Sequence, residues 1–157
     1  MNLKFLGDAL DHWKGSVFEG LQSSNVLEDF RVDAMASDID NWRPEDRSLY
    51  AKLLRVRESQ IVEHKATLDS NRKEYFYEIP RYGDLFLDPD TGIKTSSGKN
   101  KQYIKLDEVF YLMNHERHRI LAVYQHGSRD RTMRSRVKDV FNVLRLVHPK
   151  CYFTSYY

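Results

Sequence analysis

The chain has 157 residues, of which 41% are apolar and 31% charged, and this length is typical of one globular domain. The 25 Lys and Arg against 23 Asp and Glu give a net charge of +2, so overall charge does not mark a nucleic-acid or membrane binder. The single cysteine, Cys151, excludes an intramolecular disulfide and a multi-cysteine zinc site. Because the sequence contains no apolar run long enough to span a membrane and no apolar core of a signal peptide, we expect one soluble, cytoplasmic domain over residues 1–157.

Expected strands and helices alternate in the first half of the chain. Apolar residues from Leu6 to Leu21 recur at steps of three and four, which predicts a helix with Asp8 as its N-cap. Pro44 suits the first turn of a second helix. In chain order we expect a short strand at residues 3–6, the first helix to residue 22, a strand at 27–35, the second helix at 44–56, a strand at 60–68, and an ambiguous segment at 71–82 that fits a helix ended by Pro80.

Two continuous apolar runs, residues 85–87 and 120–123, dominate the second half. Strands covered on both faces lack alternation, so these runs predict neighbouring central strands of a parallel sheet. The whole pattern predicts an α/β fold, a single three-layer domain with a mostly parallel sheet. In chain order we expect a strand at residues 84–88, a loop at 95–101, a helix at 106–113, a strand at 120–124, a helix at 137–147 and an aromatic strand at 151–157.

Charged side chains follow the expected strands, at the edge where parallel sheets bind ligands. Carboxylate oxygens are the usual ligands of Mg²⁺, so the sequence predicts a magnesium site made by Asp88, Asp90, Asp33 and Asp8. A histidine serves as general acid or base and a lysine neutralises a phosphate, so the expected catalytic residues are Asp88, Asp90, His126 and Lys14.

These segments also have structural interpretations. Residues 88–92, Asp-Pro-Asp-Thr-Gly, fit an Asx or type I turn. Asp8 and Asp11 fit an N-cap followed by a solvated acid. Asp8 and Lys14 join the site only if the first helix begins at the carboxyl edge of the sheet.

The C-terminal part of the chain is basic. Residues 115–150 carry nine Lys and Arg against three acids, a net charge of +6. We expect this stretch to hold a phosphate backbone, with an ordinary solvated helix face as the alternative. The expected nucleic-acid contacts are Arg129, Arg131, Arg134 and Lys138, of which the last three share a helix face.

Two segments resemble Rossmann-type S-adenosylmethionine-dependent nucleic-acid methyltransferases, nearest the large-subunit rRNA adenine N6-methyltransferases. Residues 5–14 are similar to the family's H-A-G-N-x-A-D-x-x-K-H segment, and residues 85–90, with the following helix and strand, repeat the layout around its D-P-P-Y motif. The resemblance implies a Rossmann-type fold, bound S-adenosylmethionine and a nucleic-acid substrate. It also implies a core longer than this chain, with a truncation at the C-terminus.

The chain departs from that family at positions that matter. Asp90 stands in place of the second Pro and Thr91 in place of the Tyr, and residues 33–40 contain no glycine loop for the cofactor. The segments Asp-Pro-Asp-Thr-Gly and Tyr-Gln-His also resemble uncharacterised bacterial and phage proteins, which supply no activity to carry over.

Three functions follow as hypotheses. The first is metal-dependent phosphodiester cleavage of a nucleic acid or nucleotide at the acidic centre. The second is methyl transfer from S-adenosylmethionine. The third is a non-catalytic module that binds a protein partner, such as a phage or defence-related inhibitor.

Overall fold

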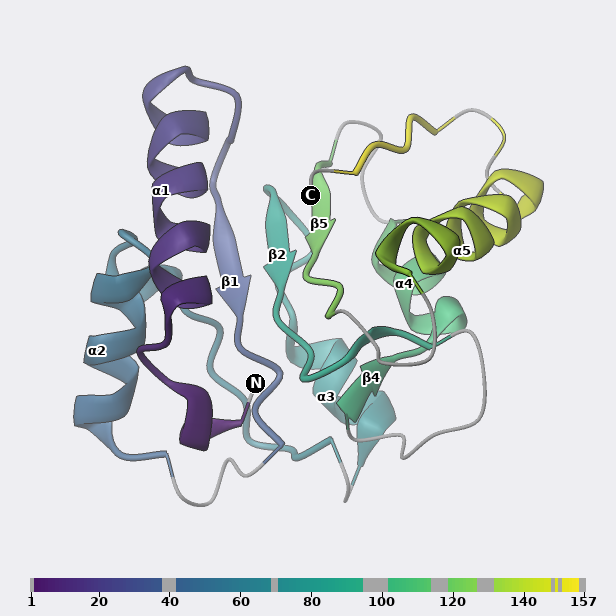
Figure 1. Cartoon of the computed structure of the whole chain (residues 1–157). Helices are drawn as coiled ribbons and strands as arrows, with labels where there is room; N and C mark the ends of the chain where they lie inside the picture. Colours follow the sequence, from purple (N-terminus) through teal and green to yellow (C-terminus); the bar gives the residue numbers. More distant parts are fainter. Residues whose placement is uncertain are drawn as a thin grey trace.

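A computed structural model describes residues 2–37, 42–68, 71–94, 102–113, 119–126, 132–147, 149 and 151–155. Helices and short strands alternate along these residues (Figure 1). The helices are η1 (Leu3–Phe5), α1 (Ala9–Ser23), α2 (Pro44–Leu53), η3 (Glu58–Gln60), α3 (Arg72–Glu78), α4 (Leu106–Met113) and α5 (Met133–Val147). The strands are β1 (Arg31–Asp33), β2 (Leu85–Leu87), β3 (Gly92–Ile93), β4 (Tyr103–Ile104) and β5 (Leu121–Val123).

A small parallel sheet forms the centre of the fold. Its strand order is β1-β2-β5, with Val32 beside Phe86 and Phe86 beside Ala122. β2 and β5 are therefore neighbours, as predicted. The prediction that both are central is wrong, since β5 is an edge strand in the described part of the chain and its residues are only half-buried. Apolar residues pack on both faces of β5, so its apolar run does not distinguish an edge strand from a central one.

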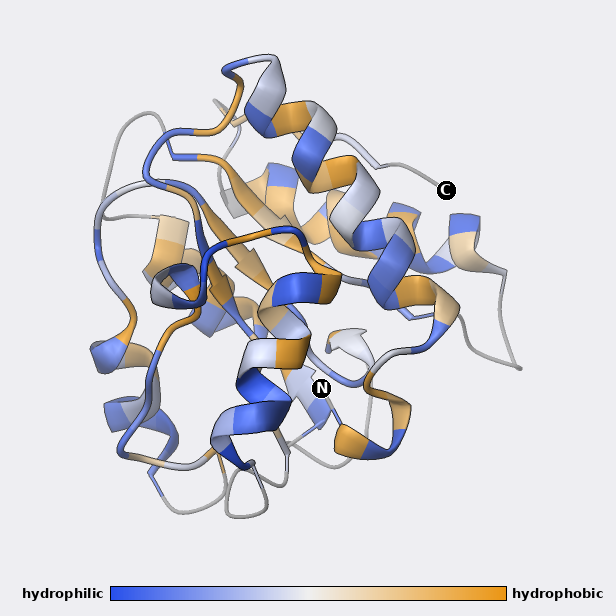
Figure 2. Cartoon of the chain, turned by 90° about the vertical axis from the view of Figure 1, so that its left-hand side faces the viewer, coloured by the Kyte–Doolittle hydropathy of each residue, from blue (hydrophilic) through white to orange (hydrophobic). Residues whose placement is uncertain are grey.

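Helices cover both faces of the sheet, which gives the expected α/β layering. On one face, Val32 and Phe86 pack against Phe18 of α1 and Leu54, which follows α2. On the other face, Leu85 and Leu87 belong to a cluster supplied by α3, α4 and α5. Figure 2 shows the hydrophobic strands behind helices whose outer turns are hydrophilic. The side chains of β2 thus alternate between two apolar layers.

Local sequence signals explain where the first two helices begin. The Asp8 carboxylate accepts hydrogen bonds from the backbone N–H groups of Leu10 and Asp11, which caps α1. Pro44 occupies the first turn of α2, as predicted. α1 then lies very close to α2 at Gly15, where an added Cβ would come 2.1 Å from the carbonyl oxygen of Leu53.

Three expected strands are absent from the described residues, for local reasons. Residues 3–5 form η1, because the Asn2 side chain accepts the backbone N–H of Lys4. Within residues 60–68, only an isolated bridge between Ile61 and Val32 forms, while the Gln60 amide donates to the carbonyl oxygen of Phe30. Residues 151–155 form no strand, and Phe153 packs on Phe141 of α5.

The other expected elements occur with changed bounds, except α4, which has the expected bounds, and α5 begins four residues earlier than expected. The segment at residues 71–82 contains α3, which ends at Glu78, two residues before Pro80. The loop expected at residues 95–101 lies outside the described residues. None of the described helices is long and apolar enough to cross a membrane.

Candidate functional site at the carboxyl edge of the sheet

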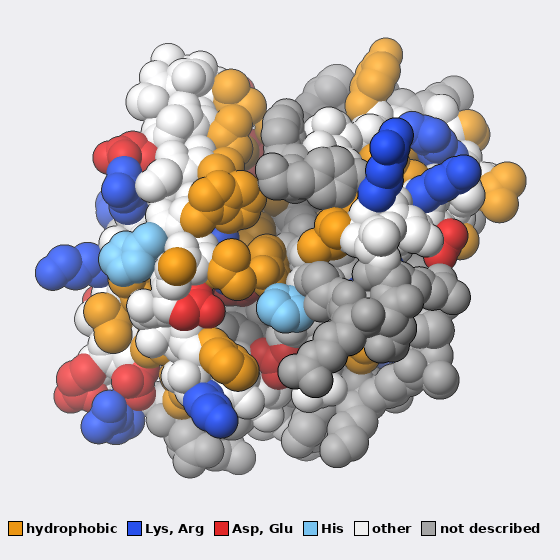
Figure 3. Space-filling model, viewed as in Figure 1, with side chains coloured by type: hydrophobic (Ala, Val, Ile, Leu, Met, Phe, Trp, Pro, Cys, Tyr) orange, Lys and Arg blue, Asp and Glu red, His pale blue; other side chains and the backbone are white. Residues whose placement is uncertain are grey.

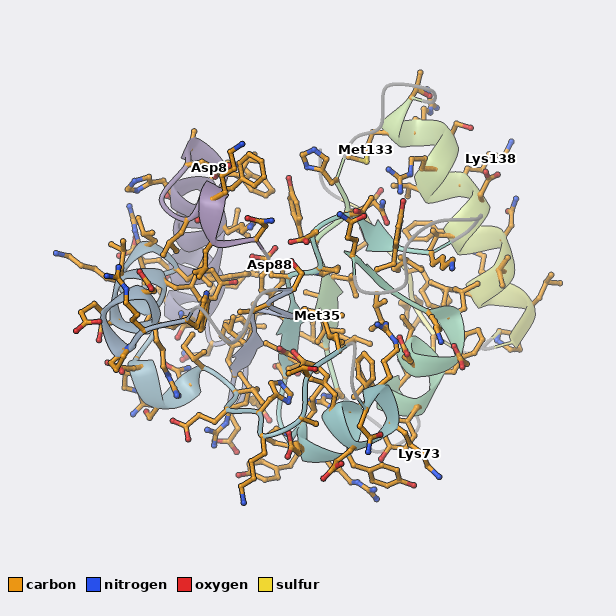
Figure 4. The ribbon with its side chains drawn as sticks, turned by 90° about the horizontal axis from the view of Figure 1, so that it is seen from below. Asp8, Met35, Lys73, Asp88, Met133 and Lys138 are labelled. Atoms are coloured by element: carbon orange, nitrogen blue, oxygen red, sulfur yellow. The ribbon has the colours of Figure 1, made fainter. Side chains whose placement is uncertain are left out.

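The carboxyl ends of the three parallel strands meet at one edge, which is the edge seen in Figure 4. Asp33 is the last residue of β1, Asp88 follows β2 and Tyr124 follows β5. The backbone N–H of Asp88 donates to the carbonyl oxygen of Asp33 at 3.0 Å, which joins the first two ends directly. α1 starts at the same edge, so Lys14 reaches the site as the sequence required.

A buried ion-pair cluster lies at the centre of this edge. The Lys14 Nζ donates to both oxygens of Asp88, at 2.9 and 2.8 Å, and to Oδ1 of Asp11 at 3.1 Å. The Tyr50 hydroxyl donates to Oδ2 of Asp88 at 2.7 Å. Only 6% of the Lys14 side chain and 3% of the Asp88 side chain are exposed. The cluster joins α1 and α2 to the end of β2.

The charges of this cluster stabilise one another. Burial lowers the pKa of the Lys14 ammonium, but Asp88 and Asp11 more than reverse this and leave that pKa raised. Burial and the Asp88 carboxylate raise the pKa of the Tyr50 hydroxyl well above its usual value. Lys14 therefore stays charged and Tyr50 stays a neutral donor at neutral pH.

Tyr124 covers the cluster on the side of β5. Lys14 Nζ lies 4.4 Å from the centre of its ring, a cation–π contact. The Tyr124 hydroxyl lies 3.4 Å from Nδ1 of His126, whose side chain is exposed. Burial raises the pKa of Tyr124, and the Lys14 ammonium opposes that rise. His126 thus lies at the predicted edge of the sheet and is near Tyr124, which covers the buried cluster.

The His126 backbone is held firmly. Its N–H donates to the carbonyl oxygen of Thr91 at 3.2 Å, and its own carbonyl oxygen accepts Nη1 of Arg136 at 2.7 Å. The Gln125 amide accepts the N–H of Ile93 and donates to Thr91, so it also holds the loop that contains Asp90. These bonds fix the Asp-Pro-Asp-Thr-Gly segment against the end of β5.

Asp33 belongs to a second buried cluster. Its Oδ1 accepts the Tyr75 hydroxyl at 2.7 Å and the backbone N–H of Met35 at 2.9 Å. His64 stacks on the Tyr75 ring, with Nε2 at 3.2 Å from Asp33 and Nδ1 at 3.4 Å from Glu78. Burial alone would raise the pKa of Asp33, but His64 lowers it below its usual value. Burial would lower the pKa of His64, but Asp33 and Glu78 raise it.

Three of the four side chains predicted to bind Mg²⁺ are engaged in other contacts. Asp8 caps α1, Asp33 is held in its own buried cluster, and both oxygens of Asp88 accept hydrogen bonds from Lys14. Within the described ranges, no three His, Cys, Asp or Glu side chains form a group that could hold a metal ion. An ammonium at the centre of the carboxylates also repels a dication. The magnesium site stays a prediction that these residues do not favour.

The residues after β1 do not fit S-adenosylmethionine either. In Rossmann-type sheets the cofactor uses the crevice beyond this strand, next to a glycine-rich loop. Here Met35, at φ +44°, turns the chain directly after β1, and its side chain is 1% exposed within the apolar core. Figure 4 places Met35 beside Asp88 near the middle of the edge. The buried Met35 side chain thus occupies part of the space directly after β1.

Sequence reasoning found part of this site. It identified Lys14, Asp88, Asp33 and His126, and the structure places all four at the carboxyl edge, where Lys14 pairs with Asp88 while Asp33 and His126 make other contacts. It missed Tyr50, Tyr75 and His64, which reach the edge from α2, from α3 and from a segment without regular structure. Tyr50 and Tyr75 each lie near apolar residues of their helices, so no local signal separated them from core aromatics.

The basic stretch forms a surface along α5. A shallow hollow of about 260 Å³ is lined by Arg134, Val137, Lys138, Phe141, Asn142, Arg145 and Ser155. It contains three cations and no acid, and Figure 3 shows Lys and Arg side chains gathered over this helix. Arg136 points inward to His126 instead, and Arg129 and Arg131 lie outside the described residues.

Comparisons with protein-family models, with curated proteins and with solved structures find no match for this chain.

Proposed function

We propose that this protein binds nucleic acid, with phosphate groups held on the basic face of α5. The hollow lined by Arg134, Lys138 and Arg145 carries this proposal. In the part of the chain that the structure describes, none of these three cations forms an ion pair with a carboxylate. Cations without counter-charges attract a polyanion, and binding releases the counterions of its phosphates.

The dimensions of the face suit several phosphates in a row. Arg134 and Arg145 are eleven residues apart, which is about 16 Å along a helix. Lys138 lies between them on the same side of α5, and Asn142 and Ser155 add hydrogen-bonding groups to the rim. The Arg145 guanidinium lies 5.6 Å from the centre of the Phe141 ring, which limits its freedom in the unbound protein.

The buried ion-pair cluster at the carboxyl edge of the sheet is a second part of the proposal. Arg136 ties the start of α5 to the backbone of His126, so a chain bound along α5 runs toward that histidine. Metal-dependent phosphodiester cleavage at this edge requires a metal ion to displace the Lys14 ammonium from Asp88, with His126 as the general acid or base. Incubation of DNA and RNA with the protein in Mg²⁺ or Mn²⁺, with Asp88→Asn as the inactive control, tests cleavage separately from binding. Inhibition of a protein partner stays an alternative that no particular contact favours.

The test of binding is a salt titration with short DNA and RNA. Arg134→Ala/Lys138→Ala removes two cations from the hollow, and Lys52→Ala/Lys65→Ala removes two exposed cations elsewhere. We expect only the first variant to bind more weakly, with its log–log salt slope reduced by about 0.7–0.9 for each phosphate that the variant no longer neutralises. Equal affinity and slope in both variants and the wild type would show that this face does not bind nucleic acid.

A further inference from the structure

A group of aromatic and cationic side chains lies on another surface, between α3 and α4. We name this group, which consists of Lys73, Tyr77, Arg81 and Tyr111, the tyrosine–arginine cluster. The Arg81 guanidinium lies 5.6 Å from the centre of the Tyr77 ring and 5.8 Å from that of Tyr111, and its Nη2 donates to the Tyr111 hydroxyl at 2.9 Å. The two rings are 5.5 Å apart at 62°. Arg81 thus fixes both rings.

The cluster is open to ligands. Tyr77 is 51% exposed, and Lys73 and Arg81 are also exposed. Lys73 Nζ lies 5.8 Å from the Tyr77 ring, on an unbranched side chain that can turn away from it. No carboxylate pairs with Lys73 or Arg81 among the residues that the structure describes. The surface therefore combines a half-exposed aromatic ring with two cations that lack counter-charges.

A similar tyrosine–arginine pair lies next to the cluster, because its tyrosine, Tyr82, follows Arg81 in the sequence. Tyr82 is 52% exposed, and the Arg31 guanidinium lies 5.7 Å from its ring centre. Arg31 Nη1 also donates to the carbonyl oxygen of Ser59, which anchors this cation beside the ring. Aromatic rings and cations thus recur from Lys73 to Tyr82.

We propose that the tyrosine–arginine cluster binds unpaired bases, so that the ligand of this protein is single-stranded nucleic acid. Every base has a π-face that stacks on a tyrosine, while neighbouring cations contact the flanking phosphates. In a duplex the base faces are stacked on one another and do not reach a flat protein surface. This inference rests on the proposed function for the class of ligand, but on separate residues for its evidence.

The two surfaces are far enough apart to be tested independently. In Figure 4, Lys73 of the cluster lies at the lower right of the view and Lys138 of α5 at the upper right. Stacking depends on bases, whereas the α5 face depends on phosphates alone. A thymidine oligonucleotide and an abasic phosphodiester of the same length therefore separate the two contributions.

The experiment measures fluorescence anisotropy of both probes with Tyr77→Ala, Tyr77→Phe and Tyr152→Ala. Tyr152 is fully exposed, so its variant is a matched loss of a surface tyrosine. We expect Tyr77→Ala to weaken binding of the thymidine probe about tenfold, and to leave the abasic probe and the salt slope unchanged. Tyr77→Phe keeps the ring and should bind as the wild type does.

Each remaining outcome identifies which proposal fails. If Tyr77→Ala weakens both probes equally, or neither, the cluster only joins α3 to α4 and the inference is wrong. If the wild-type protein binds a duplex as well as the thymidine probe, the inference is also wrong, while the α5 proposal stands. If the wild type binds no probe, the proposed function itself fails. Thermal unfolding of each variant confirms that the fold is kept.

Discussion

Lys14 shows how much of this fold depends on single side chains. One ammonium faces two carboxylates inside the protein, and all three charges are almost fully removed from water. The desolvation cost of such a cluster is large, so the ion pair stabilises the fold only while it is complete. Loss of one member leaves a buried charge without its partner.

We expect Lys14→Met to lower the free energy of unfolding by about 3–5 kcal/mol, because Asp11 and Asp88 then repel each other inside the protein. Lys14→Met/Asp88→Leu should recover part of this loss, since it leaves one fewer buried charge. Urea denaturation monitored by circular dichroism measures both variants. A loss below about 1 kcal/mol for the single variant would mean that water enters the site and screens the carboxylates.

The buried pair of Asp33 and His64 makes stability depend on pH. The pKa of His64 is raised above its usual 6.5, so its contribution is present below pH 6.5 and is lost as the pH rises through the folded value. The pKa of Asp33 is lowered below 3.8, so its contribution is present above that pH and is lost as the pH falls through the folded value. Together they stabilise the fold most between about pH 4 and 6.5.

His64→Gln should reduce the loss of stability that the wild type shows as the pH rises above about 6.5. The free energy of unfolding of the wild type is expected to fall as the pH rises above about 6.5, and that of the variant should fall less over the same range. Denaturant titrations across that range measure the difference. Parallel curves for the two proteins would show that folding does not raise the pKa of His64.

Among the elements, the contact between α1 and α2 controls how Lys14 reaches the sheet. The helices touch at Gly15, one residue beyond Lys14, where the carbonyl group of Leu53 leaves no room for a side chain. This close approach lets an ammonium on α1 reach the carboxylate of Asp88. Gly20 lies further along the same helix and has no heavy atom within 4 Å of an added Cβ.

Two alanine substitutions in α1 should therefore have opposite effects. Gly15→Ala forces α1 away from α2 and should destabilise the protein by about 1–3 kcal/mol. Gly20→Ala meets no neighbour and should stabilise the helix by roughly 0.5–1 kcal/mol. Thermal unfolding gives the two signs directly. Stabilisation by both would mean that the helices separate without cost.

In the whole molecule, the carboxyl edge of the sheet is acidic and well packed, whereas helix α5 is basic. Met35 is buried directly after β1, and cations are exposed instead on α5. The described residues directly after β1 therefore place a buried methionine, and no glycine-rich loop, at this edge of the sheet. The two surfaces proposed to bind nucleic acid are the face of α5 and the tyrosine–arginine cluster.

Isothermal titration calorimetry measures whether the protein binds S-adenosylmethionine. We expect no measurable heat of binding, because Met35 is fully buried where the cofactor would approach the backbone. A titration with oligonucleotide in the same buffer is the positive control. Micromolar binding of S-adenosylmethionine would show that the turn at Met35 opens.

Elements that depend on neighbours along the chain could be predicted from the amino-acid sequence. Asp8 and Pro44 mark the starts of α1 and α2, and continuous apolar runs mark β2 and β5, because capping and burial on two faces are local requirements. Asp88 was also identified in this way, since residues at strand ends meet at one edge of a parallel sheet, and Lys14 was included on the condition that the first helix begins at that edge.

The pairing of those two side chains could not be predicted, because it is a tertiary contact. Lys14 and Asp88 are 74 residues apart, and their contact depends on the packing of α1 against α2. For the same reason Tyr50, Tyr75 and His64 entered the site without a signal in the sequence. A buried hydroxyl or imidazole finds its carboxylate only when the layers of the fold assemble.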